Sequence, residues 1–363
     1  MFINPYRKLK TELLNYLKCP LTGEDLILDR IESQHDSEII NGTLISVKSK
    51  KEYKIENGIP NLIIDYSEKV ELTANQFSFE HLEVGEHLQE ARKIEEDILL
   101  FFLKTGIDSS VYELEGIDIS GLQSYKEIGY EPNWSFLKDK VIVDAGAASG
   151  RFARLVAPHC KKLILLDIGN HLYKAQEELR KYDHVHFVKC NLVKPPLMES
   201  SIDFIYSIGV LHHTPDPKQS FLSLASSIKK DGSFSLWVYP PEYWSHPIKA
   251  FVSKLIRGIL LQFPFTIQQK FIKNILLPIG RFQMKIAKSK ALKLLFAPLF
   301  ILNIPRHENK DEMLATIIDY YTPQFIFTYT NNDISNWFTE AGLKFSKLLF
   351  PTSAIGTKDR LND

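Results

Sequence analysis

The sequence has little of what defines several large protein classes. Its 363 residues include three cysteines, Cys19, Cys160 and Cys190, which are too few and too scattered for a disulfide framework. The longest apolar run, residues 294–302, has nine residues with a proline inside, whereas a membrane-spanning helix needs roughly 20. The first residues lack the apolar core of a signal peptide. We therefore expect a cytoplasmic protein.

Net charge is also absent, because 44 Lys and Arg residues balance 44 Asp and Glu residues. From this balance we expect that nucleic acid is not a partner. The charges are nevertheless distributed unevenly along the chain. Residues 66–135 contain 15 acidic and 5 basic residues, whereas residues 243–307 contain 11 basic residues and no acidic one.

Hydrophobic periodicity predicts an α/β core from residue 138 onward. Five short apolar runs, rich in β-branched and aromatic residues, begin at residues 141, 162, 185, 203 and 233, and helix-compatible stretches separate most of them. This alternation is typical of a parallel sheet with helices on both faces. Before it, residues 1–64 show short strand-like runs, and residues 87–104 fit an amphipathic helix. We expect five segments: a small β-rich domain (1–64), an acidic helical linker (65–137), the α/β core (138–242), a basic, apolar helical cap (243–315) and the completion of the core (316–363).

The stretch VIVDAGAASGRF, residues 141–152, ends the first predicted core strand in a glycine-containing turn. It lacks the middle glycine of the dinucleotide fingerprint and the Gly-Lys-Ser/Thr of a phosphate loop. This turn therefore favours a ligand that presents no phosphate. Asp167 ends the next predicted strand, where a carboxylate can accept hydrogen bonds from both hydroxyls of a ribose.

These runs, together with LILLDI, VKCNL and DFIYSIGVLHHTPDP, resemble the class I S-adenosylmethionine-dependent methyltransferases, especially a bacterial branch with the motif SIGVLHHTPDP. The resemblance covers roughly residues 138–242 and 316–350. It implies a doubly wound, Rossmann-like sheet of seven strands, with S-adenosylmethionine as cofactor. The cofactor-binding residues that the resemblance implies are Asp144, Gly146, Ala148, Gly150, Asp167, Ile168, Asn191, Leu192 and Ser207.

His212 and His213 follow the fourth predicted core strand, where acceptor chemistry takes place in this fold. Histidine titrates near neutral pH, so either residue is a candidate catalytic base. The alternative is that the pair only shapes the cofactor pocket. Methyl transfer to a good nucleophile depends mainly on alignment, so it does not require a base.

Residues 17–63 resemble a small zinc-ribbon-like domain that accompanies some methyltransferases. Of the four expected cysteines only Cys19 is present, and Thr22, Ser46 and Ser49 occupy the other positions. Because a structural zinc ion needs about four nitrogen or sulfur ligands, we predict no metal.

The basic segment, residues 243–307, has three candidate roles. It is a substrate cap with solvated lysines, a binding site for an anionic substrate, or a peripheral contact with anionic lipid. Asp319, Tyr320 and Tyr321 follow it and are candidate acceptor contacts, with core packing as the alternative.

The function that these features predict is methyl transfer to an O or N atom of a small or carrier-linked metabolite. Two alternatives are an RNA methyltransferase and a non-catalytic binding module with the same fold.

Overall fold

The computed structural model describes residues 9–35, 38–64, 67–84, 99, 103, 134–241, 247–304, 309–347 and 352–359. Most of the predicted linker, including the predicted helix over residues 87–104 apart from Leu99 and Leu103, lies outside the described residues.

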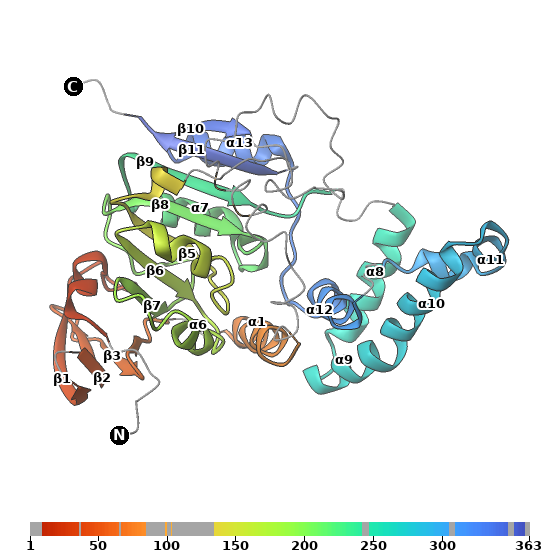
Figure 1. The fold of residues 1–363 in the computed structure, drawn as a ribbon, viewed down its shortest axis with the longest axis horizontal. Coiled ribbons are helices and arrows are strands. Elements are labelled where there is room, and N and C mark those ends of the chain that lie inside the picture. The colour runs from red at the N-terminus through yellow and green to blue at the C-terminus, as the bar shows by residue number, and fades with distance from the viewer. Residues whose placement is uncertain are drawn as a thin grey trace.

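The N-terminal residues form a separate antiparallel sheet of four strands in sequential order. A 3-10 helix, η1 (Thr11–Tyr16), precedes the strands β1 (Leu26–His35), β2 (Glu38–Ser46), β3 (Glu52–Glu56) and β4 (Ile59–Pro60). Just after β4, the Leu62 N–H donates to the Lys189 carbonyl at 2.8 Å. The small sheet therefore lies against one edge of the larger sheet (Figure 1).

The core is a sheet of seven strands in the order β10-β11-β9-β8-β5-β6-β7, which confirms the predicted doubly wound α/β fold. Five strands are parallel, and β11 pairs antiparallel with both β9 and β10. The strands are β5 (Val141–Ala145), β6 (Lys162–Asp167), β7 (Val185–Lys189), β8 (Ile202–Ile208), β9 (Ile228–Trp237), β10 (Leu343–Lys347) and β11 (Ser353–Lys358).

Helices cover both faces of this sheet, because alternate strand residues point to opposite sides. On one face Ile142 packs with η5 (Trp134–Leu137), α5 (Ala153–Val156), η6 (Ala157–His159) and α6 (Leu172–Glu178). On the other face Val141 and Val143 belong to the cluster of α7 (Pro217–Ala225) and α13 (Asn331–Glu340). The helix-compatible stretch between the first two core strands, residues 150–160, forms only the short α5, because Pro158 and the glycine turn leave room for little more than one turn.

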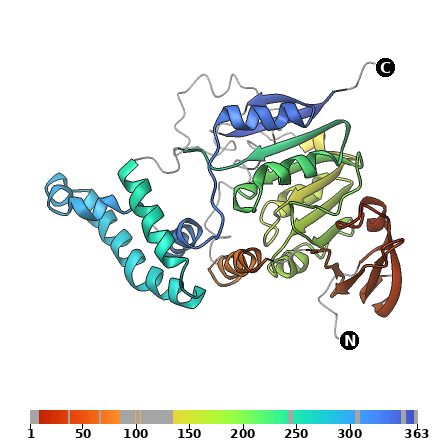
Figure 2. The same ribbon diagram turned by 180° about the vertical axis from the view of Figure 1, so that it is seen from behind.

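The cap helices extend away from the sheet, beyond α1 (Glu68–Phe79) (Figures 1 and 2). They are α8 (Pro247–Leu260), α9 (Phe265–Phe271), η9 (Ile272–Leu276), α10 (Leu277–Ala287), α11 (Lys290–Leu295), η10 (Ala297–Ile301) and α12 (Lys310–Tyr321). Their own core contains Leu260, Ile272, Met313 and Tyr321. Within the described ranges, none of the helices has the length and apolarity that crossing a membrane requires.

Candidate functional site

The candidate site lies at the mouth of the sheet, meaning the C-terminal ends of β5, β6, β7 and β8. The parallel register places Asp144 of β5 opposite Leu165 of β6, so the two strands end side by side. The N–H groups of Gly146 and Ala147 both donate to the Leu166 carbonyl, at 2.8 and 3.1 Å. The glycine turn is thereby attached to the end of β6.

Gly146 cannot be replaced by another residue without strain. Its φ is +94°, and a Cβ atom there would lie 2.3 Å from the Val210 side chain. Ala148 also has positive φ, at 49°, and its N–H donates to Asp167 Oδ2 at 2.8 Å. The turn therefore brings backbone close to the Asp167 carboxylate.

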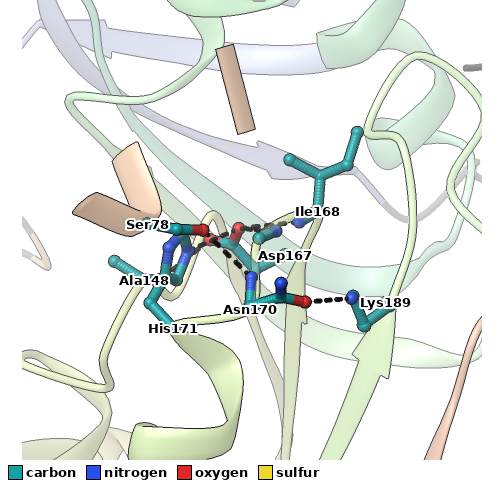
Figure 3. A network of polar contacts seen from close by, with 8 residues as sticks. Ser78, Ala148, Asp167, Ile168, Asn170, His171 and Lys189 are labelled. Atoms are coloured by element: carbon teal, nitrogen blue, oxygen red, sulfur yellow. Dashed lines mark hydrogen bonds and ion pairs between the residues drawn. The ribbon is translucent and has the colours of Figure 1, made fainter. Parts of the chain in front are cut away.

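Asp167 is the centre of a hydrogen-bond network at the end of β6 (Figure 3). Its Oδ1 atom accepts from the N–H groups of Ile168 (2.6 Å) and Gly169 (3.0 Å) and lies 2.8 Å from His171 Nε2. Burial alone would raise its pKa, but His171 and the backbone donors outweigh burial and hold the pKa well below its usual range. Asp167 is thus a carboxylate, and Oδ2 keeps capacity for a further donor besides Ala148.

Helix α1 (Glu68–Phe79) and the π-helical turn η2 (Glu80–Val84) cover this network. Ser78 Oγ accepts from the Asn170 N–H at 3.1 Å, and Asn170 Oδ1 accepts from Lys189 Nζ at 2.7 Å (Figure 3). The His81 ring lies 5.3 Å from that of His171, and burial, followed by the His171 charge, lowers the pKa of His81 to about 3. Sequence reasoning missed Ser78, His81 and His171, although His171 stands one helical turn after Asp167.

Asp144 is 4% exposed and lies beside β8, where the Tyr206 hydroxyl donates to its Oδ2 at 2.8 Å. Burial raises the pKa of Asp144 to about 8; the Tyr206 hydrogen bond opposes this shift, and the Asp167 charge adds to it. The carboxyl group therefore holds a proton at neutral pH when no cation lies beside it.

The remaining predicted cofactor residues lie around the same mouth. Asn191 follows β7 and accepts from the Val193 N–H at 3.0 Å, while Leu192 is buried in the core. Ile168 follows Asp167 directly. Ser207 is fully buried and donates to the Ala145 carbonyl at 2.8 Å, so its hydroxyl joins β8 to β5.

His212 and His213 form the turn η7 (Leu211–His213) after β8. The His212 ring packs 3.7 Å from that of Tyr239, and burial, with the His213 charge, holds its pKa well below the usual value. His213 Nδ1 lies 3.0 Å from the Phe325 carbonyl, and His213 Nε2 lies 3.4 Å from Asp319 Oδ1. The prediction that one of the pair is a catalytic base stays a prediction.

Asp319 reaches the mouth from α12. It accepts from the Tyr239 hydroxyl at 2.6 Å and faces His213, so three distant parts of the chain meet there. The two aromatic candidates, Tyr320 and Tyr321, are instead buried in the core of the cap, where the Tyr321 hydroxyl lies 3.1 Å from Ser253 Oγ. Sequence reasoning did not single out Tyr239.

The N-terminal positions expected to replace zinc ligands partly come together. Glu24 accepts from the Ser46 hydroxyl at 2.5 Å and from the Ser49 N–H at 3.0 Å, and Thr22 Oγ1 lies 3.5 Å from Ser46 Oγ. These donors, Ser46 first, lower the pKa of Glu24 to about 2. Among the described residues, no group of three or more His, Cys, Asp and Glu side chains could hold a metal ion.

Comparison with known proteins finds similarity in the core domain. Residues 143–236 match the family model described as "Methyltransferase domain". Over 105 residues the chain is 33% identical to the tRNA U34 carboxymethyltransferase of Aliarcobacter butzleri, a match that covers 26% of this chain and 33% of that protein. Over 132 residues it is 26% identical to the tRNA U34 carboxymethyltransferase of Shewanella loihica, covering 34% of this chain and 40% of that protein. The match thus spans less than half the length of either relative.

A solved structure also resembles the chain. The crystal structure of Burkholderia thailandensis 1,6-didemethyltoxoflavin-N1-methyltransferase, with bound 1,6-didemethyltoxoflavin and S-adenosylhomocysteine, aligns over 86% of this chain and 98% of that one. The TM-score is 0.41 and the sequence identity is 11%.

The names of the two curated relatives contradict our prediction that nucleic acid is not a partner. That prediction rested on net charge, which is the wrong quantity to use. The zero sum combines an acidic segment (66–135) with a segment (243–307) that has no acidic residue. Because charges are screened within about 10 Å at 0.1 M salt, local surface charge rather than the total determines binding.

Proposed function

We propose that the chain is a class I S-adenosylmethionine-dependent methyltransferase, which binds its cofactor at the mouth of the sheet and transfers the methyl group to RNA. The match of residues 143–236 to the methyltransferase-domain model and the doubly wound sheet support this proposal. The observation that carries the cofactor part is the placement of Asp144 and Asp167 at the ends of neighbouring strands, with the glycine turn hydrogen-bonded to Asp167. The names of the two curated relatives support the RNA part.

The residues at the mouth fit the cofactor. Asp144 is buried with a single hydrogen bond among the described residues, which suits it to hold the ammonium group of the methionine portion. Asp167 Oδ2 has room for a ribose hydroxyl. Ile168, Asn191 and Leu192 would line the adenine. When bound, the cofactor supplies an electrophilic methyl group on its sulfonium.

Two titratable groups would act on the acceptor side. Asp319 and His213 face one another at 3.4 Å, and Tyr239 orients Asp319 through its hydroxyl. This pair would take the proton that an N–H or O–H acceptor loses. His212 would remain neutral, because burial opposes its protonation, and it would support Tyr239 by ring packing.

Calorimetric titration tests the cofactor part. We expect S-adenosylmethionine and S-adenosylhomocysteine to bind the wild type with micromolar affinity. The Asp167→Ala variant removes a charge-assisted hydrogen bond of about 1.5–3 kcal/mol to the ribose, so affinity is expected to fall by about 10- to 150-fold.

Asp203→Ala is the matched control. Asp203 also belongs to the core sheet and accepts from the Val141 N–H (2.8 Å) and from Lys229 Nζ (3.0 Å), but at the opposite end of the strands. Its removal is expected to leave the affinity within about threefold of the wild type. Absence of binding to the wild type, or equal losses in the two variants, would refute cofactor binding at this mouth.

Transfer of radiolabel from methyl-labelled cofactor to fractionated cell extract tests the acceptor. We expect the radiolabel to be in RNA, so that ribonuclease treatment of this fraction releases it. Label confined to lipid or small-molecule fractions would contradict the RNA proposal, while leaving cofactor binding intact.

A further inference from the structure

Exposed apolar side chains are concentrated in the cap. Of the 17 exposed large hydrophobic residues among those described, 12 lie between Ile248 and Ile301. Single exposed apolar residues are ordinary on protein surfaces, but a concentration of this kind marks an interaction site.

Helix α8 shows the arrangement most clearly. Ile248, Phe251, Leu255 and Ile259 follow one another at intervals of three or four residues, so they share one side of the helix, here called the apolar stripe. Phe251 is 69% exposed. The opposite side of α8 carries its two buried residues, Ser253 and Leu260. An amphipathic helix that only packed on the protein would turn its apolar side inward, whereas α8 has large apolar residues on its outer side.

The second exposed group lies at the distal end of the cap, on α11 (Figure 1). Leu294 and Leu295 are 79% and 71% exposed, and no residue of α11 is buried. Leu292 is exposed on the same short helix. The end of the cap that projects farthest from the sheet is therefore apolar as well.

Positive charge surrounds these apolar residues. The cap sequence contains 11 Lys and Arg residues and no acidic residue between positions 243 and 307. The exposed ones include Lys254 beside the apolar stripe, Lys285 and Lys288 at the end of α10, and Lys290 and Lys293 on α11. A surface that combines exposed leucine and phenylalanine with lysine complements the interface of an anionic bilayer.

The apolar stripe faces away from the helix that reaches the candidate site. On the inner side of α8, the Ser253 hydroxyl lies 3.1 Å from that of Tyr321, and the Arg257 guanidinium donates to the Pro323 carbonyl. Both partners lie within four residues of Asp319, which is at the mouth. A partner that binds the apolar stripe therefore contacts the side of α8 that faces away from the mouth.

We propose that the apolar stripe of α8, together with α11, binds the surface of a membrane that contains anionic lipids. The leucine and phenylalanine side chains enter the headgroup region, and the surrounding lysines contact the anionic headgroups. The phosphates of RNA would pair with the lysines, but RNA would leave the exposed aliphatic side chains in water. This inference does not depend on the identity of the methyl acceptor.

Flotation of the full-length protein with vesicles tests the proposal. Vesicles of phosphatidylcholine alone are compared with vesicles that also contain phosphatidylglycerol, at low and high salt. We expect the wild type to bind the anionic vesicles at least about tenfold more strongly, with binding weakened by salt. The double variant Phe251→Ser, Leu255→Ser is expected to lose about tenfold or more of this partitioning.

The control is the double variant Ile27→Ser, Ile31→Ser, which removes two comparably exposed apolar side chains from β1. It is expected to bind vesicles as the wild type does, and circular dichroism serves to check that both variants are folded. The triple variant Lys285→Gln, Lys288→Gln, Lys290→Gln is expected to lose the preference for anionic lipid.

Three results would overturn the proposal. The first is no binding to anionic vesicles. The second is binding that the stripe variant leaves unchanged. The third is a wild type that instead binds RNA, or forms a dimer by light scattering, through contacts that the stripe variant abolishes. None of these results would affect the calorimetric test of cofactor binding.

Discussion

The raised pKa of Asp144 makes protein stability depend on pH in an unusual direction. The unfolded carboxyl group titrates near 3.8, whereas burial raises the folded pKa to about 8. Between these values the folded state binds more protons than the unfolded state. Stability from this group is therefore fully present at acid pH and is lost as pH rises through this window.

The Asp144→Asn substitution removes this titration while preserving the side-chain shape. From the two pKa values, keeping Asp144 buried costs about 4 kcal/mol more at pH 7 than at acid pH, as an upper bound. The Asn variant can still accept from the Tyr206 hydroxyl. Its stability relative to the wild type is therefore expected to increase by roughly 1 kcal/mol per pH unit between pH 5 and pH 8.

Urea unfolding followed by circular dichroism at pH 5, 6, 7 and 8, at constant ionic strength, measures this difference. Asp203→Asn provides the control, because it weakens two contacts that hold the sheet and is expected to destabilise the protein. If Asp144→Asn is less stable than the wild type at pH 8, or if the difference is independent of pH, the reasoning about Asp144 is wrong.

The same carboxyl group couples cofactor binding to proton release. An ammonium group beside Asp144 favours the carboxylate, so binding of S-adenosylmethionine at pH 7 is expected to release about one proton. Calorimetry in two buffers with different ionisation enthalpies measures this release, and Asp144→Asn is expected to abolish it.

Three glycines are expected to respond differently to alanine in urea unfolding: two substitutions destabilise the protein and one stabilises it. Gly146→Ala forces a left-handed φ on alanine and a contact with Val210, so it is expected to destabilise the protein by about 2–4 kcal/mol. Gly342→Ala has positive φ but open space around it, so it is expected to cost about 1 kcal/mol. Equal losses in the two variants would contradict the close approach of Val210 to Gly146. Gly258→Ala, in open space within α8, is expected to stabilise the protein by about 0.5–1 kcal/mol, because alanine favours helix more than glycine does. A loss of stability would contradict the open space around Gly258.

Local sequence pattern was sufficient to predict the core strands. The five apolar runs became β5 to β9, and the sheet of seven strands that the family resemblance implied is confirmed. Helix boundaries were less well predicted. The stretch 150–160 has a helical pattern but gives only the short α5, because turn geometry at Gly150 and Pro158 overrides the local preference for helix.

The candidate site could be predicted only in part. Asp167 and the glycine turn are close in sequence, so spacing was enough to place them together. Tyr206 and Asp144 are 62 positions apart, and Tyr239 and Asp319 are 80 apart. No spacing rule connects such residues, because only strand order and the docking of α12 bring them together.

By itself, the sequence determined the alternation of strands and helices, the ligand-compatible turn at Gly146, and the separation of acidic from basic segments. These features depend on neighbouring residues and on backbone conformation. Only the tertiary structure decided that burial raises the pKa of Asp144, that Asp319 faces His213, and that the apolar stripe of α8 points outward. Burial, pKa and exposure depend on contacts between distant parts of the chain, and these exist only once it has folded.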